Sequence, residues 1–506
     1  MLTATVEVSP ELVVAPVRRR TFGSFVEHLG RCVYGGIYEP GHPGADVDGL
    51  RTDVLDLVRE MGVSVVRYPG GNFVSGYRWE DGVGPVAERP TRLDSAWRSV
   101  ESNEFGLGEF ARWAGRAGVE PMMAVNLGTR GVQEALDLLE YSNHPQGTHL
   151  SDRRVADGSA EPFGIRMWCL GNEMDGPWQL GHKTAVEYGR LAAETARAMR
   201  MLDRGLELVA CGSSGSGMPT FGAWESTVLE LAYDQVDHVS AHAYYEYRDG
   251  DLDSFLASAV DMDHVIDAVV AIADGVGARL GSTKKIMVSF DEWNVWYQSR
   301  MSDWLSKDWA TAPRFSEEAY TAVDAVVVGG LLISLLRHSD RVAVACQAQL
   351  VNALAPIRAE LGGPAWRQTT FHPFALTARH ARGEVLRTEI VAPVRETARY
   401  GPVPVLDMAV THDRDEGEVA VFALNRHPDE PLTVSLDARG FDGYQPVGQL
   451  TMGGREGLEL TNTQEEPDRV RPVPAATAPT VTDGRLRAVL PPASWNLIRL
   501  RSGLPG

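Results

Sequence analysis

Cysteine is scarce in this chain of 506 residues, which contains only four. They stand far apart, at Cys32, Cys169, Cys211 and Cys346, and no two form a C-x-x-C pair. This spacing argues against a zinc or redox motif. Three of the four lie in strand-like apolar runs, where a small buried thiol is the usual case. We therefore expect a reducing compartment, the cytoplasm, rather than an oxidising one.

Basic residues are also in the minority, since 48 Lys and Arg stand against 68 Asp and Glu, for a net charge of −20. Nucleic acids and anionic membrane surfaces are bound through clustered Lys and Arg, so this balance argues against both as partners. The N-terminus lacks the basic segment and long apolar core of a signal peptide. The most apolar stretch, 326–336, is too short to cross a bilayer. We expect a soluble protein with a neutral substrate.

The length of the chain favours one large domain plus a smaller one. From about residue 18 to 382, apolar β-rich runs alternate with helical ones. We predict strands at 21–28, 63–70, 120–128, 165–173, 207–213, 236–245, 285–293 and 342–351. Eight strand-then-helix units in order predict a (β/α)8 TIM barrel, an α/β fold. A doubly wound open sheet is the alternative, but no G-x-G-x-x-G follows the first strand.

The last part of the chain has a different pattern. Beyond about residue 383 helical periodicity stops, and short strand-like runs are separated by Gly, Asp, Asn and Pro clusters. This pattern predicts an all-β sandwich, jelly-roll-like in type. The alternating segment near the N-terminus needs neighbouring strands, so we expect it to join this domain. The predicted units are an N-terminal strand (1–17), a barrel (18–382) and a β-sandwich (383–506).

Polar side chains follow the C-terminal tips of the predicted barrel strands, where α/β barrels carry their chemistry. In chain order they are Glu27, Asn72, Asn126, Glu173, Ser213, His242 with Tyr244, Glu292 and Gln349. An isolated polar tip is more often a helix cap or a solvated loop residue. Eight in succession favour one shared pocket. Because side chains alternate along a strand, Asp291 and Glu292 are expected to point in opposite directions.

Glycoside hydrolysis requires at least two carboxylates. Glu173 and Glu292, on separate predicted strands, are the candidates. One donates a proton to the leaving oxygen, and the other stabilises or attacks the oxocarbenium-like centre. The residues alone leave open which carboxylate has which role. Tryptophans and tyrosines cluster after Glu292, and such clusters are more often core than ligand platform. We nevertheless expect Trp296 to line the pocket, because sugars present apolar C–H faces.

Other signals carry less weight. The glycine-rich segment 212–217 lacks the Lys-Ser/Thr ending of a P-loop, which favours an ordinary loop. Several histidines raise the question of a metal, but no His-Glu-x-x-His occurs. The spacing of His242 and Tyr244 suits hydrogen bonding to a carboxylate better than ligation, so we expect no metal and no cofactor. Glu317 and Glu318 are interpreted as solvated charges at a helix start.

The segment WCLGNEMDGPWQ (168–179) resembles the acid/base motif of glycoside hydrolase family 51, the α-L-arabinofuranosidases. Further motifs similar to that family stand in the same order at 23–31, 67–73, 93–97, 103–106, 291–296, 349–352 and 491–496. They cover essentially the whole chain. The resemblance implies an exo-acting enzyme that removes terminal arabinofuranosyl groups from arabinoxylan or arabinan oligosaccharides. It also implies a homo-oligomer, a hexamer.

The same resemblance implies a retaining mechanism, with Glu173 as general acid/base and Glu292 as nucleophile. Retention predicts carboxyl groups about 5–5.5 Å apart, against about 6.5–9.5 Å for inversion. By similarity, Asn172 would bind the sugar 2-OH. The other implied substrate contacts are Glu27, Asn72 and Gln349 on further hydroxyls, Tyr244 and His242 beside the glutamates, Trp296 at the sugar and Trp97 at the pocket mouth.

Two alternatives stay open. The first is another retaining barrel glycosidase, such as an endo-glucanase or a galactofuranosidase, which would share both glutamates and differ in the loops around Trp97 and Trp296. The second is a non-catalytic carbohydrate-binding protein with a degenerate barrel. The presence of both Glu173 and Glu292 argues against the second alternative.

Overall fold

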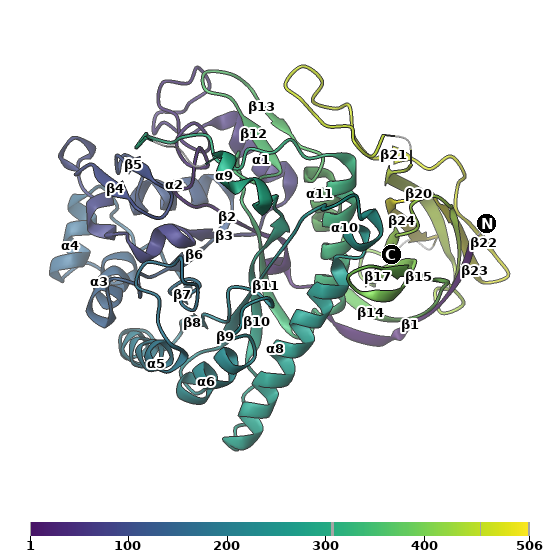
Figure 1. Ribbon diagram of the computed structural model, residues 1–506, viewed down its shortest axis with the longest axis horizontal. Coiled ribbons are helices and arrows are strands. Elements are labelled where there is room, and N and C mark those ends of the chain that lie inside the picture. The colour runs from purple at the N-terminus through teal and green to yellow at the C-terminus, as the bar shows by residue number, and fades with distance from the viewer. Residues whose placement is uncertain (1, 305–307, 456, 504–506) are drawn as a thin grey trace.

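The computed structural model describes residues 2–304, 308–455 and 457–503. Within them, eight parallel strands close into a barrel in the order β10-β11-β2-β3-β6-β7-β8-β9 (Figure 1). The strands are β2 (Gly23–Phe25), β3 (Val65–Tyr68), β6 (Glu120–Ala124), β7 (Met167–Leu170), β8 (Glu207–Ala210), β9 (His238–Tyr245), β10 (Met287–Val295) and β11 (Val342–Ala348). Each overlaps the run predicted from the sequence, and the barrel prediction is confirmed.

Helices surround the barrel and connect its strands (Figure 1). The longer ones are α1 (Thr52–Met61), α2 (Leu107–Ala117), α3 (Val132–Asn143), α4 (His149–Ala156), α5 (Ala185–Leu202), α6 (Ala223–Ala232), α8 (Ala259–Arg279), α10 (Ala322–Arg337) and α11 (Phe371–His380). Short turns are α7 (Leu252–Leu256), α9 (Met301–Trp304), η1 (Arg19–Phe22), η2 (Asn72–Ser75), η3 (Trp79–Gly82), η4 (Val86–Glu88) and η5 (Gln298–Arg300). Local chemistry sets their ends. At the start of α5, for example, Thr184 and Glu187 form a capping box.

A large antiparallel-rich sheet forms the second unit and lies to the right in Figure 1. Its ten described strands are ordered β21-β20-β24-β18-β17-β14-β1-β19-β23-β22. They are β1 (Leu2–Pro16), β14 (Glu384–Val391), β17 (Leu406–Asp413), β18 (Glu418–Asn425), β19 (Leu432–Asp437), β20 (Tyr444–Gly453), β21 (Val473–Pro474), β22 (Thr480–Thr482), β23 (Arg485–Leu490) and β24 (Ser494–Ser502). The prediction of a second, all-β domain is confirmed.

The N-terminal strand β1 belongs to this sheet, where it pairs antiparallel with β14 and parallel with β19. In Figure 1 it is the purple arrow among yellow-green strands. We propose that the domains divide at 1–17 with 383–506 on one side and 18–382 on the other. These pairings support that division.

Side chains alternate between the two faces of this sheet, and the two faces pack into separate hydrophobic cores. In β18, Val419, Val421 and Ala423 pack inside the β domain. Their neighbours Ala420, Phe422 and Leu424 belong to the core of the barrel unit. A strand buried on both faces must be apolar at every position, which is why β18 shows no polar alternation.

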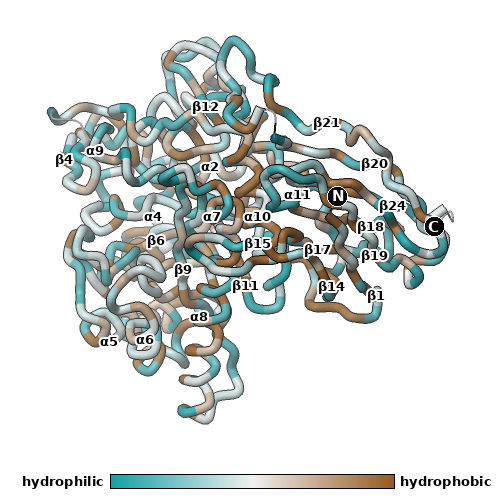
Figure 2. Tube along the Cα trace, turned by 45° about the vertical axis from the view of Figure 1, so that its right-hand side comes forward, coloured by the Kyte–Doolittle hydropathy of each residue, from teal (hydrophilic) through white to brown (hydrophobic). Residues whose placement is uncertain are grey.

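Helix α10 is covered all round, because the barrel lies on one side and the β domain on the other. Its residues from Ala322 to Leu336 are buried. Figure 2 shows hydrophobic, brown segments where α10 lies near β17. This explains the most apolar stretch of the chain as a helix between two domains. None of the helices in the described part of the chain is long and apolar enough to span a membrane.

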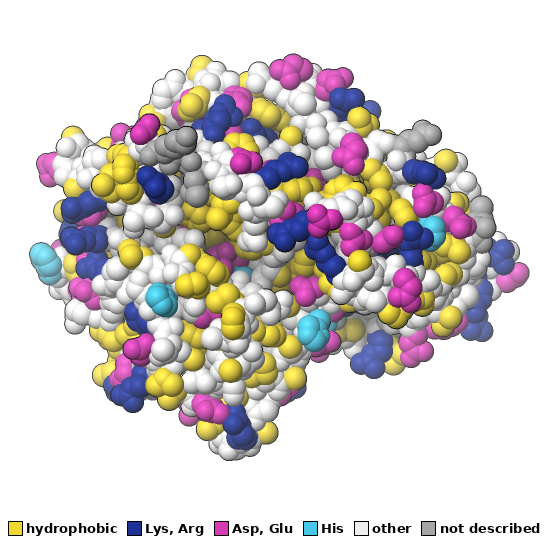
Figure 3. All heavy atoms as spheres, viewed as in Figure 1, with side chains coloured by type: hydrophobic (Ala, Val, Ile, Leu, Met, Phe, Trp, Pro, Cys, Tyr) yellow, Lys and Arg dark blue, Asp and Glu magenta, His cyan; other side chains and the backbone are white. Residues whose placement is uncertain are grey.

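Three hairpins and a surface of mixed charge complete the fold. The hairpins are β4 (Arg92–Asp94) with β5 (Ser99–Glu101), β12 (Ile357–Ala359) with β13 (Ala365–Arg367), and β15 (Val394–Thr397) with β16 (Gly401–Pro404). The β4–β5 hairpin carries Trp97 at its turn. On the face in Figure 3, acidic and basic side chains are interspersed.

Candidate active site

Glu173 and Glu292 meet at the C-terminal end of the barrel. Glu173 lies just past β7 with a left-handed backbone (φ 45°), following Gly171 at φ 93°. Glu292 lies within β10. Oxygens of the two carboxylates are within 4.8 Å of each other, and both side chains are buried. Left-handed backbone is costly for a residue other than glycine, and such strain tends to occur at functional sites.

Strand β10 contains one extra residue immediately before Glu292. Ser289 pairs with Ser240 of β9, but Glu292 pairs with His242, so three steps in β10 oppose two in β9. Such a β-bulge breaks the alternation of side chains. Asp291 and Glu292 therefore both enter the barrel, where each contacts groups of the site. The prediction that they point in opposite directions is wrong for this reason.

Glu292 is held by a donor on each oxygen. Arg67 donates from Nη1 to Oε1 at 2.7 Å, and the Tyr244 hydroxyl donates to Oε2 at 2.8 Å. Arg67, fully buried on β3, also donates from Nη2 to Oδ1 of Asn172 at 2.7 Å. This fixes the Asn172 amide with its Nδ2 buried and without a partner among the described residues. Asn172 is thus left with a donor to offer a ligand.

Glu173 also has a partner on each oxygen. Nδ1 of His242 lies 2.9 Å from Oε1, and Nε1 of Trp178 donates to Oε2 at 3.0 Å. Burial raises the pKa of Glu173, as does the charge of Glu292, while the contacts with His242 and Trp178 act in the opposite direction. A buried carboxyl with a raised pKa beside a second carboxylate suits a general acid.

Glu27 forms a second polar group on the same side of the barrel. It accepts hydrogen bonds from the Phe73 backbone at 3.0 Å and from Trp97 Nε1 and Gln349 Nε2, both at 2.8 Å. Burial raises the pKa of Glu27 to about 7, helped by the charge of Glu292 and opposed by these donors. A β-carbon added to Gly71 would lie 3.2 Å from Oε1 of Glu292 and 3.3 Å from Oε2 of Glu27. Glu27 and Glu292 therefore flank one backbone position.

The predicted aromatic contacts lie at the same end of the barrel. The Trp296 ring is edge-on to Tyr244, with centroids 4.9 Å apart, and its N–H donates to Ser316. Trp97 is only 8% exposed, so it forms an inner wall against Phe315 rather than an open platform.

Asn72 lines a cavity of about 230 Å³ between the loop after β3 and the β4–β5 hairpin.

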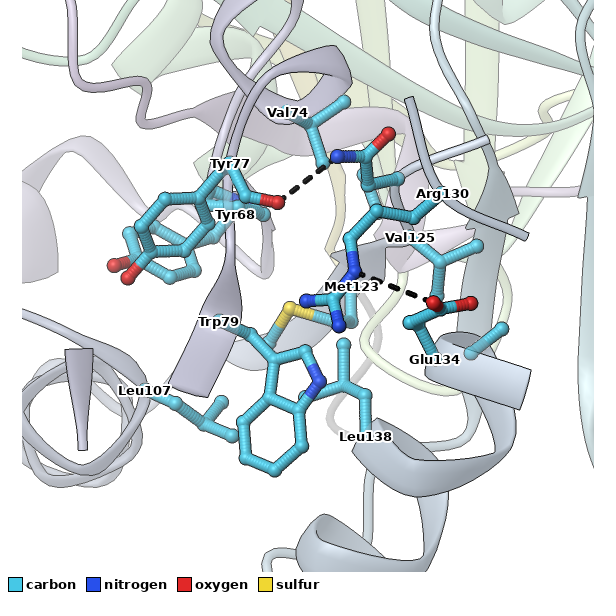
Figure 4. Close-up of a pocket in the computed structure, with 14 residues that line it drawn as sticks. Tyr68, Val74, Tyr77, Trp79, Leu107, Met123, Val125, Arg130, Glu134 and Leu138 are labelled. Atoms are coloured by element: carbon cyan, nitrogen blue, oxygen red, sulfur yellow. Dashed lines mark hydrogen bonds and ion pairs between the residues drawn. The ribbon is translucent and has the colours of Figure 1, made fainter. Parts of the chain in front are cut away.

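Two polar strand tips, Asn126 and Ser213, make no side-chain hydrogen bond to this group among the described residues. Asn126 holds its own loop, bonding the Tyr77 carbonyl and Thr129. It lines a cavity of about 30 Å³, room for one water, which Figure 4 shows bounded by Tyr77, Trp79 and the Arg130–Glu134 ion pair. The Ser213 hydroxyl is buried and has no hydrogen-bond partner among the described residues, while its backbone N–H donates to Glu225. A tip position alone does not decide whether a side chain faces the barrel axis.

Glu317 and Glu318 are not solvated, contrary to the expectation from the sequence. Both are 6% exposed. Glu317 is paired with Arg31, Arg314 and Arg358. The carboxylate oxygens of Glu318 have no hydrogen-bond partner among the described residues. The charges of this segment are therefore enclosed by the loops around β12, which the sequence pattern did not indicate.

Comparison with known proteins gives a family for this site. Residues 57–276 match the family model described as α-L-arabinofuranosidase 1 domain, and residues 291–494 match the α-L-arabinofuranosidase C-terminal domain. A protein of Streptomyces lividans named intracellular exo-α-(1→5)-L-arabinofuranosidase is 58% identical over all of this chain and 76% of its own length. The chain belongs to glycoside hydrolase family 51.

Other members of family 51 are similar along their whole length. A Bacillus subtilis protein, also named intracellular exo-α-(1→5)-L-arabinofuranosidase, is 49% identical over 99% of both chains. The solved family 51 α-L-arabinofuranosidase of Bifidobacterium longum superimposes with a TM-score of 0.94 at 48% identity. It covers 99% of this chain and 100% of that one.

Three residues that contact the site have no individual signal in the sequence: Arg67, Trp178 and Asp291. Arg67 lies inside a strand rather than at its tip, and an arginine there needs buried acceptors that only the fold supplies. Asp291 was excluded by alternation. Trp178 is 53% exposed, and its only available signal was its place in the 168–179 motif.

Glu173, His242 and Glu292 form the one described set of His and acidic groups close enough to share a cation. Their chemistry suits proton transfer better. Each oxygen of the two glutamates already has a donor or ring nitrogen facing it, and His242 has a carboxylate at each ring nitrogen. The neighbouring carboxylates raise the pKa of His242 to about 10 against the effect of burial, which favours a ring protonated on both nitrogens, and such a ring has no lone pair for a metal.

Proposed function

We propose that this chain is an exo-acting, retaining α-L-arabinofuranosidase that removes terminal non-reducing arabinofuranosyl groups from oligosaccharides by double displacement. The observation that carries the proposal is the pair Glu173 and Glu292, with oxygens within 4.8 Å of each other. This bound applies to one oxygen of each carboxylate, and it supports the separation of about 5–5.5 Å found in retaining enzymes over the about 6.5–9.5 Å found in inverting ones. Membership of family 51 supports the substrate class.

In the first step, Glu292 attacks the anomeric carbon while Glu173 gives its proton to the departing oxygen. Arg67 and Tyr244 hold the Glu292 carboxylate in one orientation from opposite oxygens. The bond from carbon to the leaving oxygen breaks as the ester bond to Glu292 forms. The raised pKa of Glu173 keeps its proton available for this step.

In the second step, water attacks the anomeric carbon of the arabinofuranosyl ester and Glu173 accepts the proton of that water, while the bond from this carbon to Glu292 breaks and restores the Glu292 carboxylate. Formation of the ester removes the negative charge of Glu292, one of the causes of the raised pKa of Glu173. Glu173 then becomes a stronger acid, and its carboxylate is suited to act as the base.

We expect the substrate to be bound by polar side chains of the site that still have a hydrogen-bonding atom available. We propose that the unpartnered Nδ2 of Asn172 binds the sugar 2-OH. Glu27, Asn72 and Gln349 would bind further hydroxyls, and Trp296 and Trp97 would enclose the ring. His242 would lie beside the two glutamates and act on Glu173. No metal or cofactor takes part in this scheme, and full activity after exhaustive chelation is the expected result.

The test is hydrolysis of 4-nitrophenyl α-L-arabinofuranoside followed by proton NMR. The first-formed arabinose should keep the anomeric configuration of the substrate. Inversion would refute the double displacement, and inactivity on the arabinofuranoside would refute the substrate class. Relatives named for (1→5) activity make (1→5)-linked arabino-oligosaccharides the first natural substrates to assay, with (1→6)-linked ones in parallel because a Bifidobacterium longum relative at 52% identity is named for that activity.

The alternatives make different predictions. A galactofuranosidase or an endo-glucanase would prefer the corresponding aryl glycosides in a substrate panel. A non-catalytic sugar-binding protein would bind arabinose and release nothing. Glucanase-type barrels at 10% identity share the fold alone with this chain.

We further propose a cytoplasmic enzyme that acts on short oligosaccharides, as the names of the intracellular relatives suggest. We also propose a homo-oligomer, a hexamer on the basis of the family resemblance. Light scattering on the purified protein tests this, and a monomer at micromolar concentration would contradict it.

A further inference from the structure

The ring of His242 lies between two carboxylates. Its Nδ1 is 2.9 Å from Oε1 of Glu173, and its Nε2 is 2.9 Å from Oδ1 of Asp291. Asp291 is a carboxylate and can only accept, so a neutral ring would satisfy both contacts only if Glu173 carried its proton on Oε1 and donated it to Nδ1. Both contacts are satisfied when the ring carries a proton on each nitrogen.

The surroundings of Asp291 favour its ionised form. It is fully buried and also accepts a hydrogen bond from the Ser289 hydroxyl at 3.0 Å. Nε of Arg67 lies 3.9 Å away. Burial alone would raise the pKa of Asp291, but Arg67 and His242 hold it below its ordinary value. The acid that faces Nε2 of His242 is therefore a carboxylate throughout the reaction.

We propose that Asp291 is a positioning residue that acts through His242 to place the acid proton of Glu173 on Oε2. This rests on the proposed function of Glu173 as acid/base. Oε1 faces the N–H of a cation and Oε2 faces the neutral indole of Trp178, so the proton of Glu173 is favoured on Oε2. No proton moves along the chain Asp291–His242–Glu173; the two residues orient the acid and stabilise its conjugate base.

The other contact of Glu173 agrees with this assignment. Nε1 of Trp178 donates to Oε2, which a protonated oxygen can still accept through its remaining lone pair. The leaving oxygen must then approach Oε2 on the side of Trp178. The same oxygen would take the proton of the attacking water in the second step, so one atom serves both steps.

The charges around the ring also favour its protonated form. Burial alone would lower the pKa of His242, but Glu292, Asp291 and Glu173 together raise it to about 10. On its own strand the nearest titratable neighbour is Tyr244, which bonds Glu292. The cation Arg67 faces Asp291 and Glu292 from β3, and the thiol of Cys169 lies 3.7 Å from Oδ2 of Asp291.

The decisive variant is Asp291→Asn, which removes the charge and keeps the shape. The ring of His242 should then become neutral near pH 7, and the acid proton is no longer confined to Oε2. We expect kcat/KM to fall about 100-fold for arabino-oligosaccharides, whose leaving groups need the acid, and less than about tenfold for a 2,4-dinitrophenyl arabinofuranoside. Asp261→Asn is the matched control, because Asp261 accepts from Tyr245 of the same strand, outside the site.

The pH profile separates positioning from a general structural role. The imidazolium lowers the pKa of Glu173. Its loss in Asp291→Asn should therefore move the alkaline limb of kcat/KM to higher pH. If the substitution only distorted the site and His242 stayed protonated, kcat/KM would fall and its alkaline limb would stay at the same pH. An equal loss on both substrate classes with an unmoved limb would overturn the proposal.

Nitrogen-15 NMR of histidine-labelled protein gives a readout that does not depend on activity. The wild-type signal, identified by its absence in His242→Gln, should show both ring nitrogens protonated from pH 6 to 8. A neutral ring in the wild type would refute the assignment even if Asp291→Asn failed to fold. Wild-type protein that is inactive on every arabinofuranoside would contradict the proposed function, and the NMR result would still decide the charge of His242.

Discussion

Asp291 and Glu292 are consecutive residues that both turn into the barrel, because an extra residue in β10 interrupts the alternation of its side chains. One accepts from Nε2 of His242 and the other from the hydroxyl of Tyr244, two residues further along β9. A regular strand would place only one of these two carboxylates in the site. The bulge thus supplies both the proposed nucleophile and the counter-charge that orients the proposed acid.

Glu173→Ala should separate substrates by their leaving groups. We expect kcat/KM to fall about 10²- to 10⁴-fold for arabino-oligosaccharides, because their leaving oxygen must be protonated, and much less for a dinitrophenyl arabinofuranoside. Glu292→Ala should abolish turnover of both while binding of arabinose persists in calorimetry. The reverse pattern, with Glu292→Ala sensitive to the leaving group, would exchange the two proposed roles.

Gly71→Ala should impair the site without unfolding the protein. The new β-carbon would lie 3.2 Å from Oε1 of Glu292, tighter than ordinary contact, and close to both oxygens of Glu27. Small displacements of reacting groups are costly, so we expect kcat/KM to fall about 10- to 100-fold. Gly41→Ala is the control, because a β-carbon there meets no atom within 4 Å. Equal kinetics for the two variants would contradict this account.

The sequence predicted the barrel well, because each buried parallel strand is an apolar run bounded by turns, and this pattern is local. It also predicted that Glu173, His242, Tyr244 and Glu292 share one pocket, since strand ends of a barrel meet at one face. Both predictions rest on short-range periodicity in the sequence. The individual contacts between these side chains, in contrast, are seen only in the folded structure.

The sequence-based predictions are wrong or incomplete where contacts between distant segments determine the position of a side chain. The bulge before Glu292 depends on the register of β10 against β9 and β11, which no window of the sequence contains. Glu317 looks solvated in isolation, yet Arg31 and Arg358 from distant segments pair with it, in addition to its neighbour Arg314. Arg67 is similar, because its role depends on acceptors that lie more than a hundred residues away.

Trp178→Phe should change the acidity of Glu173 while the aromatic ring is kept. The N–H of Trp178 lowers the pKa of Glu173, so its loss should raise that pKa and shift the alkaline limb of kcat/KM upward by about half a pH unit. Trp309→Phe, which alters another exposed tryptophan, serves as the control. A downward shift of the limb for Trp178→Phe would show that the N–H stabilises the neutral acid instead.

Glu318→Gln should remove a pH-dependent cost to stability. Burial raises the pKa of Glu318 from 4.5 to about 7, so the folded chain binds more protons than the unfolded chain between these values. Wild-type stability therefore falls as pH rises from 4.5 to 7. Measured by thermal or denaturant unfolding, the advantage of the variant should grow by about 3 kcal/mol from pH 4.5 to pH 8. The exposed Glu416→Gln should show no such slope. A constant difference between Glu318→Gln and wild type across this range would mean that the carboxylate finds a partner in solution.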